Sequence, residues 1–558
     1  MILKNNPTLM AVLDAETLAP ATTPPPARLS KISQEDFDAM VQESIDTFDM
    51  EPEEAVESAL EECAMQKRDV SAICKKADGV NAREALPIVV AFRKLDAQLP
   101  KGVPLPGTTE QTTHELDAAK IAEAIDDVRS AITACSDDDE RANMLCIAAD
   151  VGLTGCALYA CRCAAATADS ALLVNALHAL KDCLGAQMPR DVFVHCKGSI
   201  ELCAYLTTYA DDVQVATATC VVVEAAASKH EASKDAHVKA GIPTALVGIF
   251  EKHADDDAAC LACVEAMRRI ATADDPTPMQ ASGAFRYARD MGKGGGAVAV
   301  LSAIKRRASR LGSVDLDAAL AASKATDASA SAEEADARED DADASTPSVP
   351  TTSAADASSL VSLLASLVAT LKRLAANDEV VMLLFDAGVV PTTLSLIAWC
   401  TGPHSFQFQP RLCRSACSLL WQTACSDGPK ESIINDGTTL LGDVVRRYPK
   451  HAGVLEQAVG ALGAATLRQP ALAESAASMG AFETCADALK AAPEKEWVCR
   501  QACLAGSNMV RRSDECKSRA HAANLEELVR SARARHPKSC KDVGTAFLRD
   551  LGIEDYKN

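Results

Sequence analysis

The chain has 558 residues, of which 48% are hydrophobic but only 4% aromatic, so its core must be built from small aliphatic side chains, as in closely packed helices. The formal net charge of −22 repels phosphate backbones and disfavours general nucleic-acid binding. No uninterrupted apolar run reaches about 18 residues, so we expect no membrane span. The 22 cysteines lie in apolar helical runs, which predicts reduced core thiols in an intracellular protein, cytoplasmic or nuclear.

The N-terminal part divides into a leader and an acidic helical segment. Residues 1–30 contain acids and end in ATTPPPAR, which fits no secretory or transit signal, and we expect a flexible leader. Residues 31–76 form the acidic segment, in which positions 32–62 hold twelve acids and no Lys or Arg. Ser33 with an acid three residues later has the form of a helix-capping box, and Pro52 is expected to begin a second helix.

One phrase, a glycine before an apolar run, recurs through the rest of the chain, as in KAGIPTALVGIF at 239–250. Its copies are 46, 43, 55, 92, 49, 43 and 43 residues apart, anchored at Gly152, Gly198, Gly241, Gly296, Gly388, Gly437, Gly480 and, in degenerate form, Ala523. A period in the forties is typical of armadillo and HEAT arrays. The sequence therefore predicts an all-α, armadillo-like right-handed superhelical solenoid of about eight or nine three-helix repeats.

Each anchor glycine is expected to turn one helix into the next, because glycine takes positive φ at a helix end and Pro243 or Pro391 suits the first turn that follows. Between these corners, leucines recur at steps of three and four residues, which places them on one face of a helix. The two clearest faces are Leu173, Leu177, Leu180, Leu184 and Leu364, Leu367, Leu371, Leu374. Stacked neighbouring repeats are needed to cover such faces.

The 92-residue interval contains an insertion. Residues 318–358 are rich in Ala, Asp, Ser and Thr and almost free of large apolar residues, so they cannot bury enough surface to order the chain and are expected to be disordered. The repeats then occupy residues 85–317 and 359–558. We expect the insertion to be dispensable for folding.

The sequence resembles the armadillo repeat-containing protein 6 family in residues 31–63, in the array, in RQACLAGSNMV (500–510) and in CKDVGTAFLRDLG (540–552). The resemblance implies an all-helical armadillo solenoid without a known catalytic activity. One departure is SGAFRYARD (282–290), where animal members carry a histidine-rich stretch, so no role of those histidines is carried over.

Catalytic, cofactor-binding and metal-binding residues are not predicted. MGKGGGAVAVL (291–301) could be imagined as a phosphate loop, but it lacks the Walker spacing and falls on a repeat corner, so a turn is the favoured interpretation. Cys260 and Cys263 form a C-x-x-C pair inside an apolar helix without a second pair at zinc-finger distance, which favours core packing over zinc or redox chemistry.

Ser309 is a candidate phosphorylation site. It follows Arg306 and Arg307 in KRRASR (305–310), a charge pattern that basophilic kinases read, and it borders the expected disordered insertion. An ordinary basic helix end is the favoured alternative, because four-residue patterns arise often by chance. The same basic cluster is a weak candidate for nuclear import.

The third helices are expected to line a groove. In the best-known armadillo peptide binders, asparagines on these helices hold an extended peptide, because an amide donates and accepts hydrogen bonds at once. The aligned position here keeps the amide of Asn508 and otherwise carries side chains that no longer form an asparagine ladder. These groove candidates are Asp182, Glu224, Arg269, Arg373, Gln422, Ala464 and Asn508.

The predicted function is a non-catalytic protein-interaction scaffold or adaptor, monomeric and without cofactors, that binds a protein or peptide through the groove or the acidic N-terminal helices. The alternative is a transport adaptor that holds a basic cargo peptide on Asp182 and Glu224. A basic cargo would dissociate as ionic strength rises. An enzyme or nucleotide binder would rest only on the glycine run at 291–301.

Overall fold

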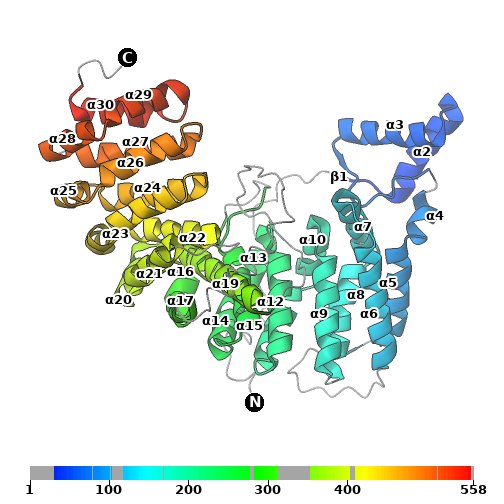
Figure 1. The fold of residues 1–558 in the computed structure, drawn as a ribbon. Coiled ribbons are helices and arrows are strands. Elements are labelled where there is room, and N and C mark those ends of the chain that lie inside the picture. The colour runs from blue at the N-terminus through cyan, green and yellow to red at the C-terminus, as the bar shows by residue number, and fades with distance from the viewer. Residues whose placement is uncertain are drawn as a thin grey trace, which may run out of the picture. The chain divides into compact units, whose positions relative to one another are not determined.

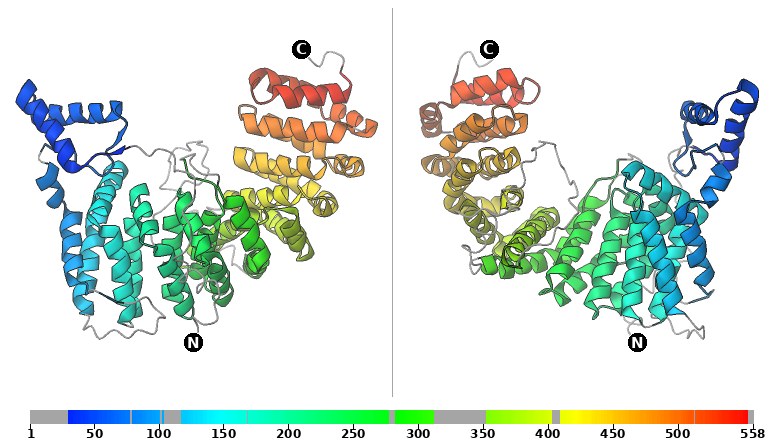
Figure 2. Two further views of the ribbon diagram at one scale, coloured as in Figure 1. Left: turned by 180° about the vertical axis from the view of Figure 1, so that it is seen from behind. Right: turned by 45° about the vertical axis from the view of Figure 1, so that its right-hand side comes forward.

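The computed structural model describes residues 30–77, 79–100, 102–103, 117–167, 169–276, 282–311, 352–402, 409–511 and 513–553. The chain forms two compact units, Met1–Tyr287 and Ala288–Asn558. Each unit is built from layers of short helices, which Figure 1 colours along the chain and Figure 2 shows from two further sides. The expected leader lies outside the described residues except for its last residue, Ser30, and most of the insertion also lies outside them.

The acidic segment has a small core of its own. It consists of β1 (Ser30–Lys31), α2 (Gln34–Phe48), α3 (Pro52–Met65) and β2 (Arg68–Asp69), with β1 and β2 paired in parallel. Ser33 caps α2 by accepting a hydrogen bond from the Asp36 amide at 3.0 Å, and α3 begins at Pro52, as the sequence predicts. The side chains of this core include Phe37, Val41, Ala59 and Cys63.

The remainder of the first unit consists of helices in layers. After α4 (Gly79–Glu84), the first layer holds only α5 (Pro87–Gln98) and α6 (Ala118–Thr133). Three-helix layers follow: α7 (Asp138–Val151), α8 (Leu153–Ala166) and α9 (Ser170–Cys183); α10 (Gln187–His195), α11 (Gly198–Thr208) and α12 (Val213–Ala227); α13 (Glu231–Lys239), α14 (Ile242–Lys252) and α15 (Asp257–Ile270). Asn143 of α7 donates to the carbonyl of Ser71 at 2.7 Å and so joins the acidic segment to this stack.

The second unit repeats the same plan. Helix α16 (Ala284–Met291) crosses the division between the units, and the layer continues with η2 (Gly292–Gly296), α17 (Ala297–Leu311) and α19 (Thr352–Leu374). The following layers are α20 (Asp378–Asp386), α21 (Val389–Thr401) and α22 (Gln409–Thr423); α23 (Asp427–Arg447) and α24 (Ala452–Ala465); α25 (Pro470–Ser478), α26 (Ala481–Ala491) and α27 (Glu496–Val510); α28 (Asp514–Ala522), α29 (Leu525–Arg535) and α30 (Lys541–Leu551).

Within each unit, the last helix of each layer packs on the last helix of the next. In the first unit this row is α6, α9, α12 and α15, and in the second it is α19, α22, α24, α27 and α30. All eight leucines of the two predicted faces are buried, each at 0% exposure. The described residues thus contain nine layers of two or three helices, and the prediction of an all-α armadillo solenoid is confirmed.

The predicted corners are right at four glycines and displaced at three other positions. Gly152, Gly241, Gly388 and Gly480 all take positive φ between two helices. In three other corners the residue with positive φ is a neighbour of the predicted one: Lys197 and not Gly198, Gly295 and not Gly296, Asn524 and not Ala523. Gly198 is required for a different reason, because a Cβ there would lie 2.1 Å from the ring of Phe193.

The corner predicted at Gly437 is wrong. Helix α23 runs without a break through this residue, and the Thr438 hydroxyl donates to the Ile434 carbonyl at 2.7 Å within the helix. A Cβ at Gly437 would lie 3.1 Å from Leu394 of α21. The glycine here allows close packing of two helices and does not turn the chain, so this layer has two helices.

Helix α19 corrects the end of the predicted insertion. It begins at Thr352, six residues before the expected boundary at 358, because an Ala- and Ser-rich stretch can extend the helix that the following leucines anchor.

The segment Ala357–Leu374 of α19 is long and apolar enough to cross a membrane, contrary to our composition-based expectation. Two bent helix pairs, α7 with α8 and α20 with α21, are also long and apolar enough. In the structure 67% of the α19 segment is buried, and α17 and α22 pack against the helix.

This boundary gives a prediction for two deletions. Removing residues 318–351 is expected to leave helicity and melting temperature nearly unchanged, because that stretch has almost none of the large apolar residues that form a core. Removing 318–358 also deletes the first turns of α19, including Ala357, which is only 3% exposed, and is expected to lower the melting temperature. Circular dichroism on both variants makes the comparison. A large loss of helicity in the shorter deletion would contradict the repeat boundaries.

Candidate protein-interaction surface

The exposed face of the third helices carries the predicted groove residues. We use third helix for the last helix of each layer. Within each unit, each third helix packs against the neighbouring third helices of its row and against a helix of its own layer. The face that remains is open to solvent. The contacts of the predicted residues on this face decide what they can offer to a ligand.

In the first unit, Asp182 of α9 is already paired. Its carboxylate lies 3.2 Å from Nε of Arg129 on α6, and the guanidinium of Arg129 also donates to Asn175 at 2.9 Å. Asn175 in turn donates to Asp126 of α6 at 2.8 Å. These side chains therefore form a network of ion pairs and hydrogen bonds that joins α9 to α6.

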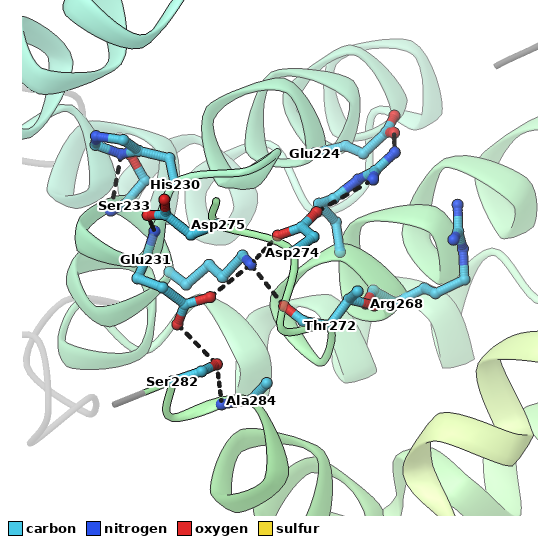
Figure 3. A network of polar contacts seen from close by, with 12 residues as sticks. Glu224, His230, Glu231, Ser233, Arg268, Thr272, Asp274, Asp275, Ser282 and Ala284 are labelled. Atoms are coloured by element: carbon cyan, nitrogen blue, oxygen red, sulfur yellow. Dashed lines mark hydrogen bonds and ion pairs between the residues drawn. The ribbon is translucent and has the colours of Figure 1, made fainter. Parts of the chain in front are cut away.

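Glu224 and Arg269, which the sequence predicted as separate groove positions, contact one another. Arg269 of α15 lies 3.3 Å from the carboxylate of Glu224 on α12, and Figure 3 shows this pair at one end of a larger polar network. Burial raises the pKa of Glu224, and Arg269 opposes that shift. Asp182 and Glu224 each already bind an arginine, so a basic ligand would have to displace it.

In the second unit, the two amides of the ladder bind backbone carbonyls of the preceding layer. Gln422 donates to the carbonyl of Ala375 at 3.0 Å, and Asn508 donates to that of Gly463 at 2.8 Å. Ala464 is half-buried and Arg373 is exposed. The structure therefore gives the retained amide of Asn508 a role in joining two repeats.

Asp274 connects the pair of Glu224 and Arg269 with a buried lysine, Lys234. Figure 3 labels Glu231, Thr272 and Asp274 of this network. Lys234 of α13 is completely buried, and its ammonium donates to Glu231 at 2.8 Å, to the Thr272 carbonyl at 2.6 Å and to Asp274. Asp274 also pairs with Arg269 at 3.4 Å. The network thus connects the first helix of this layer with the end of its third helix, and it holds the segment that follows α15.

The remaining sequence candidates lie in helices. Ser309 is exposed on α17 with its hydroxyl donating to the Arg306 carbonyl at 2.7 Å, but Arg307 is only 2% exposed, so a kinase could not read both arginines on the folded helix. Cys260 and Cys263 are both buried in α15, and the thiol of Cys263 lies 3.5 Å from that of Cys220. Hydrogen bonding to Cys220 and burial raise the pKa of Cys263. The glycine run 291–301 forms a helix-to-helix corner at Gly295.

Sequence reasoning missed a cluster on α22, α24 and α27, which we call the tryptophan strip. Trp497 and Leu504 are 42% and 37% exposed, although both are large apolar side chains. The signal in the sequence is a spacing of 44 residues that relates Gly453, Gln457 and Gly460 to Trp497, Gln501 and Leu504. The strip consists of Arg414, Trp421, Gln457, Trp497, Gln501 and Leu504.

Layers of two or three helices, whose third helices pack on one another within each unit, define armadillo repeats. The N-terminal segment identifies the relatives more closely: residues 29–87 match the model of the Armadillo repeat-containing protein 6 N-terminal domain. The resemblance to the armadillo repeat-containing protein 6 family is thereby confirmed.

Similar proteins bear out the same assignment. The chain is 27% identical to Armadillo repeat-containing protein 6 of Pongo abelii over 447 residues, which covers 79% of this chain and 74% of that protein. It is 30% identical to Armadillo repeat-containing protein 6 of Homo sapiens over 225 residues, or 40% of each chain. A crystal structure of an engineered protein is similar in fold, with a TM-score of 0.57, 15% identity, and coverage of 92% of this chain and 98% of that one.

The buried lysine gives a prediction of stability. Lys234→Ala is expected to lower the free energy of unfolding of the first unit by about 3–5 kcal/mol, because it leaves the carboxylate of Glu231 without a cation and that of Asp274 with Arg269 alone. The control is Lys239→Ala, which removes a 75% exposed side chain paired with Asp235 and is expected to cost less than about 1 kcal/mol. Urea unfolding compares the two. Equal losses would show that Lys234 does not hold the network.

His237 gives a prediction of acid sensitivity. Its imidazole is fully buried and meets Phe193 edge-on at 6.1 Å between ring centroids, and burial lowers its pKa to about 3. Below about pH 6.5 the unfolded chain binds a proton at this residue, while the folded chain does not until about pH 3. The free energy of unfolding therefore decreases as the pH is lowered from about 6.5 to about 3, by up to about 1.4 kcal/mol per pH unit. His237→Leu is expected to flatten this dependence between pH 6.5 and 5. Identical slopes in urea unfolding would contradict the prediction.

Proposed function

We propose that the chain is a non-catalytic scaffold or adaptor that binds a protein partner on the exposed face of its third helices. The armadillo fold and the relatives of the chain support a protein-binding solenoid, and the identity of the surface is our inference. No turnover chemistry enters this proposal. We also propose an intracellular location, supported by a core that contains most of the cysteine thiols.

The observation that carries the proposal is the fixed arrangement of this face. Arg129 forms a side-chain contact with the following layer, and Arg269, Gln422 and Asn508 form one with the preceding layer, at 2.8–3.3 Å. Such contacts hold neighbouring layers in register, so a ligand that spans several repeats meets a surface that is already ordered. A surface ordered before binding lowers the entropic cost of association.

The alternative of a transport adaptor for a basic cargo is less well supported by these contacts. Asp182 and Glu224, the acids expected to hold such a cargo, lie 3.2 Å and 3.3 Å from arginines of adjacent repeats. Breaking either pair to bind a lysine of a cargo would exchange one ion pair for another. Lysine substitutions at Asp182 and Glu224 would also disturb the stack itself, so they are poor tests of binding.

The proposal predicts that exposed positions on the third helices matter for partner binding and that other exposed positions do not. Thr217→Arg on α12 and Ser415→Arg on α22 add a large side chain to half-buried positions of the third-helix row. Each is expected to reduce the amount of partner retained by the tagged full chain in capture from native extract, measured by quantitative mass spectrometry. Leu383→Arg, at a 45% exposed position of α20, is the control and is expected to retain the same partners.

Circular dichroism and melting temperature confirm that each variant is folded before capture. If both third-helix variants retain every partner, the third-helix face is not the binding surface. Loss of partners only on deletion of residues 31–63 would place binding in the acidic N-terminal helices.

A further inference from the structure

We propose, building on the function proposed above, that the tryptophan strip binds an extended segment of a partner protein in which an acidic residue stands next to a large apolar residue. The strip lies entirely in the second unit, on three consecutive third helices. Three features define its ligand: exposed apolar rings and chains and, among the residues that the structure describes, amides without hydrogen-bond partners and arginines without ion pairs.

The apolar part of the strip is formed by Trp421, Leu504 and Trp497. Trp421 of α22 lies across α24, where a Cβ on Gly460 would be only 2.5 Å from its ring. Leu504 takes the same position on α27 that Gly460 takes on α24, and α27 packs against α24. Exposed tryptophan and arginine side chains are the residues most enriched at the energetic centres of protein interfaces.

The amide part lies between the two ends of the strip. Gln457 and Gln501 are 44 residues apart and occupy equivalent, half-buried positions on α24 and α27. Among the described residues neither side-chain amide forms a hydrogen bond, in contrast to Gln422 and Asn508. An amide can donate to a carbonyl and accept from an N–H of an extended chain, which is the pairing that an unpaired peptide backbone requires.

The charged part is basic. Arg414 lies over the backbone of α24, where a Cβ on Gly453 would be 3.1 Å from its Nε. Arg411 and Arg373 are also exposed on α22 and α19. Within the described part of the chain, none of these three arginines has a carboxylate partner. Unpaired cations on a chain with a net charge of −22 favour a ligand that brings its own carboxylate.

The spacing of these features specifies the order of residues in the ligand. Gly453 and Gly460 are seven residues apart, about 10 Å along α24, with Gln457 between them. A strand that crosses the helices at the level of the glutamines directs successive side chains to opposite sides. One side meets Trp421 and Leu504, and the other meets Arg414 and Trp497, which takes the position on α27 that Gly453 takes on α24. An apolar residue and its acidic neighbour therefore fit the two sides.

Peptide selection tests the inference directly. The tagged full chain is used to select from a phage library of random twelve-residue peptides, with counter-selection on the variant Trp497→Ala/Leu504→Ala. The expected result is enrichment of peptides with Asp or Glu adjacent to Leu, Ile, Phe or Trp. A fluorescein-labelled synthetic copy of the most enriched peptide is then titrated with each protein by fluorescence polarisation.

The variants separate the contributions of the strip. Trp497→Ala and Arg414→Glu are each expected to weaken binding about tenfold or more, as substitutions at interface centres do, whereas Leu383→Ala on α20 is expected to change it less than about twofold. Replacing the acid of the peptide by Lys is expected to abolish binding to the wild type and to restore part of it with Arg414→Glu. Circular dichroism on every variant excludes unfolding as the cause.

Four outcomes would overturn the inference. The first is enrichment of basic peptides, or of peptides whose binding ignores Trp497. The second is a labelled single-stranded oligonucleotide that binds in a Trp497-dependent way. The third is a dimer that Trp497→Ala dissociates in light scattering, which would make a second copy the occupant. The fourth is a tenfold gain in peptide affinity on deletion of residues 318–351, which would make the chain's own insertion the ligand of the strip.

These outcomes are distinguishable from failure of the proposed function. If Thr217→Arg or Ser415→Arg releases partners from the full chain but the selected peptides ignore the strip, the third-helix face still binds a partner and only the ligand assigned to the strip is wrong. If no third-helix variant affects any partner, the broader proposal fails as well.

Discussion

The packing of each third helix on the next within a unit is the interaction on which the rest of this structure depends. One helix of 11 to 23 residues cannot cover its own apolar face, and in α9 and α19 the leucines of that face reach 0% exposure only because neighbouring layers are present. Small residues set how close the helices come. A Cβ at Gly463 of α24 would lie 3.2 Å from Ala505 of α27, a distance that leaves little room for a larger side chain.

The same packing determines which polar side chains remain available to a ligand. A third helix places its exposed residues within reach of the helix before it, so a long polar side chain finds a carbonyl or a carboxylate there. Asn508 binds Gly463 and Gln422 binds Ala375 in this way. The amides that remain available are Gln457 and Gln501. Each lies seven residues, about two turns, before the predicted groove position of its own helix, Ala464 or Asn508. An amide that the sequence places at a peptide-binding position can thus serve instead to hydrogen-bond one repeat to the next.

This distinction also explains how much the sequence could predict. The period, the caps at Ser33 and Pro52 and the buried leucine faces are local or periodic signals, and the structure agrees with them. Corners were located to within one residue, because Lys197 and Asn524 can adopt the left-handed conformation beside the expected position. Gly437 misled the prediction, since a glycine that admits Leu394 and a glycine that turns the chain look the same in sequence. The partners of Asp182 and Glu224 lie 53 and 45 residues away, and no local pattern identifies them.

The glycines of α24 connect stability with recognition. Three glycines in one helix of 14 residues are unfavourable for the isolated helix, by roughly 1 kcal/mol each relative to alanine. In the stack two of them let Arg414 and Trp421 approach the helix backbone: a Cβ at Gly460 would lie 2.5 Å from the Trp421 ring, and one at Gly453 would lie 3.1 Å from Nε of Arg414. A helix chosen for its own stability would carry alanine at these sites, and alanine at position 460 would force the tryptophan ring to move. The low intrinsic stability of α24 is therefore tolerable because the layers on both sides hold it, and the surface that results combines an indole and a guanidinium on a flat backbone.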